Sequence, residues 1–194
     1  SVAVLPLIAD PSAAEHAYLT RSLAEALMTN LHREGSVSIA NRADTFRSAA
    51  SDASVTEIGE RLGVDKLLVG TLSAGPDQLR ASVSLVESGT GFEVWALVVE
   101  SPTSNVMVLQ SALVTAVVQR LRDDSQPAPA LDFGTDDPEA FRIGTLGTHR
   151  IRQIGDASAV AEGIDLLEQA LAIDPGFHEL YPRLLTGRVV LGMH

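Results

Sequence analysis

The chain has 194 residues, of which 45% are hydrophobic and 20% are charged, a composition that buries a core and excludes a disordered chain. It contains no cysteine, which excludes disulfides, thiolate metal sites and cysteine nucleophiles. The formal net charge of −11 is most concentrated in residues 123–137, which carry five acids and no base. No basic stripe is left for phosphates, so we expect no direct binding of nucleic acid.

The sequence also leads to expectations about membrane segments and about whether the chain is part of a longer polypeptide. No apolar run reaches about 18 residues, so we expect no membrane-spanning segment, and we expect no signal peptide in the residues given. The sequence opens on Ser1 without Met and stops at His194 within a helical pattern. We therefore expect a piece of a longer polypeptide. The compartment is left open between cytoplasm and periplasm, with the cytoplasm slightly favoured.

The first elements alternate strand and helix. Residues 2–8 form a continuous apolar run, typical of a central strand covered on both faces. Pro6 is expected near the end of this strand or where a neighbouring strand does not pair with it. Ser12 and Glu15 match a capping box. The helix that follows has a leucine at every fourth position, and Gly35 is its expected C-terminal cap. Its apolar face is made of Leu19, Leu23, Leu27 and Leu31.

The next segment contains the most ordered pattern of the sequence. Residues 37–40 predict a short strand, and residues 41–53 are polar and irregular, with room for one helical turn around Phe46. Ser54 and Glu57 match a second capping box, and Gly63 can end that helix in the left-handed conformation. The apolar residues that follow, Leu67, Leu68 and Val69, predict a strand buried on both faces.

Two further strands and a helix complete the first part of the chain. Residues 79–85 alternate apolar and polar side chains, residues 92–99 form the last strand of a meander, and residues 106–121 predict a closing helix. Right-handed crossovers place the second strand beside the first and the third strand on the other side of the first. We therefore predict an α/β fold with a five-stranded mixed sheet in the order 2-1-3-4-5, strand 4 antiparallel and helices on both faces.

These elements carry a family resemblance. The segment from Ile58 to Leu72 reads IG..LGVD.LLVGTL, and the meander supplies Leu85, Thr90, Gly91 and Trp95. Both resemble the TolB amino-terminal-like domain family, which occurs in multidomain bacterial signalling proteins. The resemblance covers residues 1–122 and implies the same sheet arrangement. It also implies an effector elsewhere in the parent protein, such as a class III adenylate cyclase, a winged-helix transcription regulator or a protein kinase.

The remaining residues predict a linker and an all-α segment. Residues 123–137 combine acids with Pro127 and Pro129, which is typical of a linker. Residues 138–194 are helical in pattern, with Asp137 and Pro138 at the first helix start. The spacing of Leu167, Ala170, Asp174 and Pro175 resembles a helix of a tetratricopeptide repeat, although the match is partial. We predict domains at 1–122 and 138–194, with more repeats following in the parent protein.

The search for a site leaves one candidate crevice. No pair of the five histidines has metal-ligand spacing, and no catalytic constellation, metal site or cofactor motif is found. In a doubly wound sheet, ligands favour the crevice where connections leave in opposite directions. Here that point lies between the first and third strands, so Asp10, Ser12 and Ser73 are candidate ligand-binding residues. The competing interpretation is that Ser12 only caps a helix.

The last helix supplies a candidate partner-binding face. Phe177, Leu180 and Leu184 share one helical face, and no following helix of this sequence covers it. We expect this face to pack on the first domain, on a second copy or on a partner. Our leading hypothesis is a non-enzymatic regulatory and protein-interaction module of a larger bacterial signalling protein. The alternative is a small-ligand sensor that uses the crevice, and a homodimer is also left open.

Overall fold

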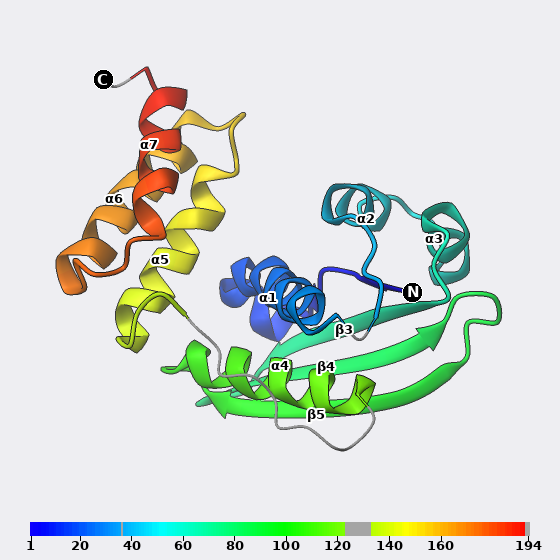
Figure 1. Ribbon diagram of the computed structural model, residues 1–194. Helices are drawn as coiled ribbons and strands as arrows, with labels where there is room; N and C mark the ends of the chain where they lie inside the picture. Colours follow the sequence, from blue (N-terminus) through cyan, green and yellow to red (C-terminus); the bar gives the residue numbers. More distant parts are fainter. Residues whose placement is uncertain (36, 123–132, 193–194) are drawn as a thin grey trace. The chain divides into compact units, whose positions relative to one another are not determined.

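The computed structural model describes residues 1–35, 37–122 and 133–192, and the chain divides into two compact units (Figure 1). The first unit comprises Ser1–Thr103 and Val108–Pro129, and the second comprises Ser104–Met107 and Ala130–His194. Residues 123–132 of the predicted linker lie outside the described residues. Residues 133–137, also predicted as linker, are part of the second unit, where the Phe133 ring meets the Phe141 ring edge-on at 5.2 Å.

A five-stranded mixed sheet forms the first unit, which confirms the predicted α/β class. The strands are hydrogen-bonded in the order β1-β3-β4-β5, and β2 also pairs with β3. Both β1 and β2 run parallel to β3, whereas β4 is antiparallel to its neighbours on each side, as predicted. The strands are β1 (Val2–Val4), β2 (Ile8–Ala9), β3 (Lys66–Ala74), β4 (Gln78–Glu87) and β5 (Glu93–Pro102).

Two of the predicted strands differ in length from the observed ones. The strand expected at residues 2–8 is interrupted around Pro6, which has no N–H to donate to a ladder, so it becomes β1 and β2. The strand expected at residues 37–40 is reduced to a parallel bridge between Val2 and Ile39. That bridge still lies beside β1, with the Ala40 N–H donating to the Val2 carbonyl at 2.9 Å, so the predicted order of the segments holds.

The described residues of the first unit form one 3-10 helix, three complete α-helices and most of a fourth, whose first two residues belong to the second unit. These are η1 (Pro11–His16), α1 (Tyr18–Glu34), α2 (Arg42–Ala49), α3 (Val55–Leu62) and α4 (Val106–Leu121). The Ser54–Glu57 capping box is present at α3, and Gly63 ends that helix at a φ of 62°. Helix α2 is longer than the single helical turn expected around Phe46, because the Asn41 side chain accepts from two backbone N–H groups at its start. Its first turn is thereby capped.

The capping box predicted at Ser12 and Glu15 is wrong. Ser12 lies inside η1, which Asp10 caps by accepting from the Ser12 N–H. The long helix α1 begins only at Tyr18, after this 3-10 segment, and its N-cap has no side-chain hydrogen bond. The reason is that an Asp followed by Pro11 starts a turn more readily than Ser12 does, since Pro fits the first helical position.

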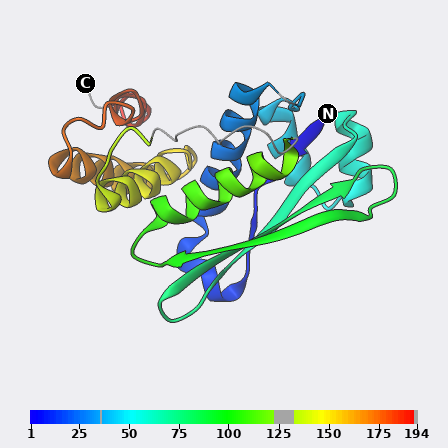
Figure 2. The same ribbon diagram turned by 60° about the horizontal axis from the view of Figure 1, so that its bottom comes forward.

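Helices cover both faces of the sheet (Figure 2). Side chains alternate between faces along a strand, and Leu67 of β3 joins Ile58 of α3 in a buried cluster on one face. Leu68 lies on the opposite face with its cross-strand neighbour Leu85. On that face the apolar stripes of α1 and α4 are buried, formed by Leu19, Leu23, Leu27 and Leu31 and by Leu109, Leu113 and Val117.

Three helices form the described part of the second unit: α5 (Pro138–Ile151), α6 (Ala157–Ile173) and α7 (Leu180–Val190). Asp137 caps α5 as predicted, and Asp156 caps α6. Helices α5 and α6 touch through their backbones: a Cβ on Gly163 would lie 2.9 Å from the Gly147 carbonyl oxygen. In the described residues of both units, no helix combines the length and apolar character that a membrane crossing requires.

Candidate functional site

The structure brings two of the three predicted crevice residues into direct contact. The Ser12 hydroxyl donates to the Asp10 carboxylate, and the Ser12 N–H donates to the same oxygen at 2.7 Å. The Ser12 Oγ also accepts from the Ala74 N–H at 2.9 Å, which joins η1 to the end of β3. Ser73 is adjacent in sequence, but its hydroxyl is directed to the Arg80 carbonyl at 3.5 Å.

These contacts already use the hydrogen-bonding groups of the crevice that a ligand would need. The Ser12 hydrogen bond holds the pKa of Asp10 below its ordinary value, with smaller contributions from backbone N–H groups. The carboxylate is thus engaged in starting η1, and the hydroxyl both donates and accepts within the fold. Asp10, Ser12 and Ser73 therefore explain how the 3-10 segment is attached to the sheet, and their geometry does not favour the sensor alternative.

The predicted partner-binding face is inside the second unit. Phe177, Leu180 and Leu184 are 4%, 2% and 8% exposed. Phe177 and Leu180 fill the space left by Gly144, where an added Cβ would lie 3.0 Å from the Phe177 ring and 2.9 Å from a Leu180 methyl. The correction has a simple reason: α7 folds back onto α5 and α6, so these side chains are core and are not free to meet a partner.

A different face of α7 is exposed. Tyr181, Leu185 and Val189 are 47%, 64% and 60% exposed and follow one another at intervals of four residues. We call these three side chains the α7 stripe. The signal was in the sequence, because this spacing marks one face of a helix. Two apolar faces share α7, and periodicity alone does not tell which of them a neighbouring helix covers.

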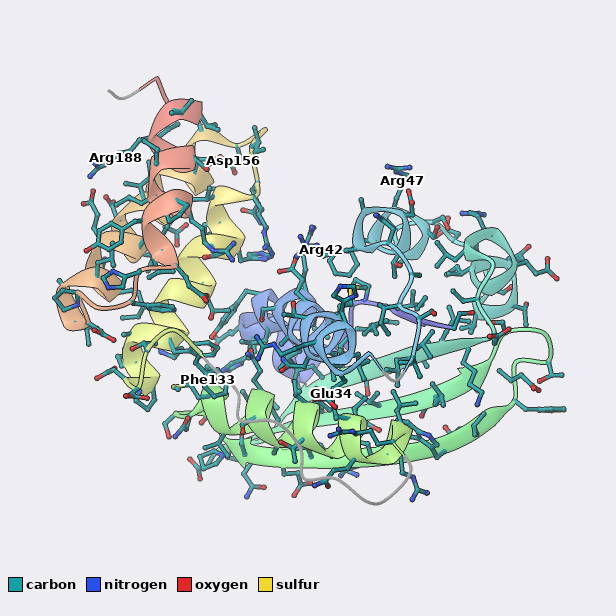
Figure 3. The ribbon with its side chains drawn as sticks, viewed as in Figure 1. Glu34, Arg42, Arg47, Phe133, Asp156 and Arg188 are labelled. Atoms are coloured by element: carbon teal, nitrogen blue, oxygen red, sulfur yellow. The ribbon has the colours of Figure 1, made fainter. Side chains whose placement is uncertain are left out.

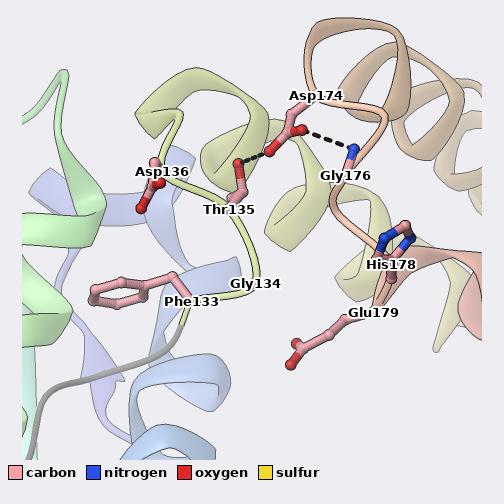
Figure 4. Close-up of a pocket in the computed structure, with 8 residues that line it drawn as sticks. All are labelled: Phe133, Gly134, Thr135, Asp136, Asp174, Gly176, His178 and Glu179. Carbon is pink, nitrogen blue, oxygen red and sulfur yellow. Dashed lines mark hydrogen bonds between the residues drawn. The ribbon is translucent and has the colours of Figure 1, made fainter.

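An acidic pocket of about 490 Å³ lies in the second unit (Figure 4). Asp174 is its central group: it accepts from the Thr135 hydroxyl and, at 2.8 Å, from the Gly176 N–H. The Thr135 hydrogen bond is the main cause that lowers the pKa of Asp174. The pocket is lined by Phe133, Gly134, Thr135, Asp136, Asp174, Gly176, His178 and Glu179. Asp174 thus connects the segment before α5 to the turn after α6.

A second pocket of about 370 Å³ lies in the first unit between α2 and α3. Its lining includes Arg47 and Arg61, but Arg47 is paired with Asp44 at 3.3 Å and Arg61 donates to the Ser51 hydroxyl at 3.3 Å. Figure 3 shows Arg47 extending outward from α2. Among the described residues, no group of three or more His, Cys, Asp or Glu side chains could hold a metal ion.

No family model matches the sequence, and no curated protein matches it. Among solved structures, the chain is similar to TolB from Acinetobacter baumannii at 14% identity and a TM-score of 0.44, over 62% of this chain and 27% of that protein. It is also similar to the lipoprotein GNA1162 from Neisseria meningitidis (19% identity, TM-score 0.41, 62% of this chain and 96% of that one). The PelC dodecamer from Paraburkholderia phytofirmans gives 18% identity and a TM-score of 0.40, over 63% and 89% of the two chains. This chain therefore spans about a quarter of the length of TolB.

Proposed function

We propose that the chain is a non-enzymatic regulatory and protein-interaction module of a larger bacterial signalling protein, of the adenylate cyclase or transcription regulator type. The first unit acts as a rigid adaptor, and the helices of the second unit, of tetratricopeptide type, bind the partner. The single observation that supports this proposal most is the α7 stripe. Three large apolar side chains at helical spacing, each about half exposed or more, form a surface that a protein partner can cover.

The argument rests on the two faces of α7. A helix on the surface of a protein has one apolar face directed at the core, and its other face is polar. Helix α7 buries Leu180, Leu184 and Gly187 against its own unit and exposes Leu185 and Val189 on another face. A helix that is apolar on two faces is typical of one packed between two layers. The second layer is the partner.

The spacing of the stripe selects the kind of partner. Side chains four residues apart form a ridge, and such ridges pack into the grooves of another helix. Beside the stripe, Arg188 is held by Glu168 at 2.6 Å, so the neighbouring charge is already paired and forms a polar rim (Figure 3). We therefore propose that the occupant is an amphipathic helix of a partner domain, seated along Tyr181, Leu185 and Val189.

Site-specific photo-crosslinking tests this proposal. A photoreactive phenylalanine analogue is placed at Leu185 in the full-length protein within its own cells, and at the exposed Asp165 of α6 as the matched control. We expect one crosslinked peptide from Leu185 only, which mass spectrometry maps to the apolar face of a partner helix. Equal yields from both positions, or a peptide from a strand or loop, would contradict the proposal.

Stability measurements complete that experiment. Leu185→Lys is expected to leave the free energy of unfolding within about 0.5 kcal/mol of the wild-type value, since exposed substitutions have small effects. Its crosslink from a photoreactive group at Val189 should disappear. A Leu185→Lys variant that unfolds the helices would show that the stripe belongs to the core of its own unit.

A further inference from the structure

Strand β5 forms one edge of the sheet. It pairs with β4 along its length, and no other strand among the described residues pairs with it. An edge strand carries a row of unpaired backbone N–H and C=O groups, to which an additional strand can be added. Figure 2 shows the two long strands β4 and β5 running together as the last hairpin of the sheet.

The hydrogen bonds between β5 and β4 fix which groups of β5 point outward. In an antiparallel ladder, successive residues direct their N–H and C=O groups alternately toward the partner and away from it. The Thr103 N–H donates to the Asp77 carbonyl at 3.0 Å, next to the pair Gln78–Pro102. Counting back by twos from Thr103, the odd-numbered residues from Trp95 on bond to β4. Ala96, Val98 and Glu100 therefore direct their amides away from the sheet.

We call residues 96–100, whose outward backbone groups pair with no described strand, the open segment of β5. At each of its ends a residue interrupts further strand pairing. At one end Leu85 is opposite Trp95 and Val86 is opposite Glu93, so Val94 is the extra residue of a bulge. At the other end Pro102 has an outward position and no N–H to donate. Between them the side chains of Ala96, Val98 and Glu100 lie on the exposed face, and Val98 is 45% exposed. The segment is thus short, apolar at its centre and bounded on both sides.

We propose that a second copy of this chain pairs with β5 in antiparallel orientation, through the segment from Ala96 to Glu100. A two-fold axis at Val98 places Val98 opposite Val98 of the second copy and Ala96 opposite its Glu100. All six of these residues then exchange outward N–H and C=O groups. The two sheets become one continuous sheet, and the interface is isologous.

Charge favours this register, and the symmetric ends of the segment favour a second copy of the chain as the occupant. A shift by two residues toward the carboxyl end would place Glu100 opposite Glu100, which is unfavourable for directly opposed like charges. At the proposed register each Glu100 faces an alanine, and it remains beside Arg80 of its own chain, 3.7 Å away. The bulge and the proline also end the pairing at the same distance on both copies. An interface of one strand pair is small, so the dimer is weak and depends on concentration.

Sedimentation velocity from about 1 µM to about 1 mM tests the pairing, a range that spans weak affinities. We expect the wild-type chain to shift from monomer to dimer within it. Val98→Pro removes an outward amide while leaving the bonds to β4 intact, and we expect it to remain monomeric throughout. Ser84→Lys, on the same face but in the interior strand β4, and Leu185→Lys, on α7, are expected to dimerise like the wild type.

Amide hydrogen exchange decides the case in which Val98→Pro does not fold. In the wild type, the amides of Ala96, Val98 and Glu100 should exchange at least tenfold more slowly at the highest concentration than at the lowest. Leu97 and Val99 should be protected at every concentration, because their amides bond to β4. A chain that stays monomeric over the whole range overturns the proposal. So does a dimer that persists in folded Val98→Pro, or one whose outward amides stay unprotected.

Discussion

The two units of this chain build their cores by different means. In the first, large side chains of a sheet and its helices fill the interior, and Leu67, Leu68 and Leu72 of β3 are 0%, 1% and 0% exposed. In the second, helices approach until their backbones touch, because Gly147 and Gly163 lie opposite each other. The first core is sensitive to polarity and the second to added volume.

This difference can be measured within one chain. Trp95 is the single tryptophan of the sequence and lies in β5, so its fluorescence reports on the first unit. The circular dichroism of helices reports on both units. Substitutions in the core of the first unit should therefore change both signals, and substitutions in the core of the second unit should change only the circular dichroism. This pattern tests the difference between the two cores.

The largest expected effect is that of Leu68→Asp. Leu68 is paired with Val4 and Leu85 and is almost fully buried, so a carboxylate there has no charged or polar partner. We expect a loss of about 4 kcal/mol or more, enough to unfold the first unit. Trp95 fluorescence should show no cooperative transition, while helical dichroism from the second unit persists. A wild-type melting curve would show that β3 is not central to the core.

Gly163→Ala should have the next largest effect, on the second unit. The added Cβ would lie 2.8 Å from the Ile151 backbone nitrogen and 2.9 Å from the Gly147 oxygen, so the two helices must move apart. We expect a destabilisation of about 1–3 kcal/mol in the helical transition, with Trp95 fluorescence unchanged. Gly155→Ala is the matched control, since nothing lies within 4 Å of its added Cβ. Equal effects of the two variants would exclude close packing as the cause.

Helix caps should have smaller effects, of equal size in the two units. Ser54 accepts from the Glu57 N–H at 3.3 Å, and Asp156 accepts from the N–H groups of Ser158 and Ala159 at 3.0 and 3.1 Å. Replacing either cap by alanine should cost about 1 kcal/mol. Chemical denaturation monitored by both signals measures it. Ser158→Ala is the control, because it keeps the backbone N–H that donates to Asp156 and removes only a hydroxyl. If Ser54→Ala changed only the helical signal, α3 would not be coupled to the sheet.

The smallest expected effect depends on pH. The Thr135 hydroxyl lowers the pKa of Asp174 in the folded state, so this interaction stabilises the second unit above the ordinary value of 3.8 and is lost as the pH falls through the lowered value. The difference in melting temperature between Thr135→Val and the wild type should therefore become smaller as the pH is lowered. Thr186→Val, whose hydroxyl bonds to the Pro182 carbonyl, should differ from the wild type by the same amount at each pH. A pH-independent effect of Thr135→Val would contradict this role.

The sequence predicted those parts of the fold that depend on capping residues or on a regular spacing of apolar side chains over many residues. The Ser54–Glu57 box, Gly63, the leucines of α1 and the order of the sheet segments follow from spacing and handedness. What it could not supply depends on competition between near-equal signals. Asp10 and Ser12 can each start a helix, and only the contact with Ala74 shows how Ser12 is used.

The candidate surfaces were harder to predict than the fold. Leu184 and Leu185 are adjacent and equally apolar, and the first is buried while the second is 64% exposed. Which one faces the core is decided by Gly144 and by the turn after α6, which set how α7 lies on its neighbours. The open segment of β5 cannot be recognised in the sequence either. Which of its amides point outward depends on which residue pairs of β4 and β5 are hydrogen-bonded.

The parallel pairing of β1 with β3 has a consequence for how the first unit folds. Ser1 and Asp65 meet across a separation of 64 residues, whereas β3, β4 and β5 are joined by short turns. Closing a long loop is slow compared with forming a hairpin. The meander can therefore assemble while β1 is still unpaired, and β1 adds to it afterwards. During synthesis, β1 leaves the ribosome before β3, and more than sixty further residues must be added before its partner strand exists.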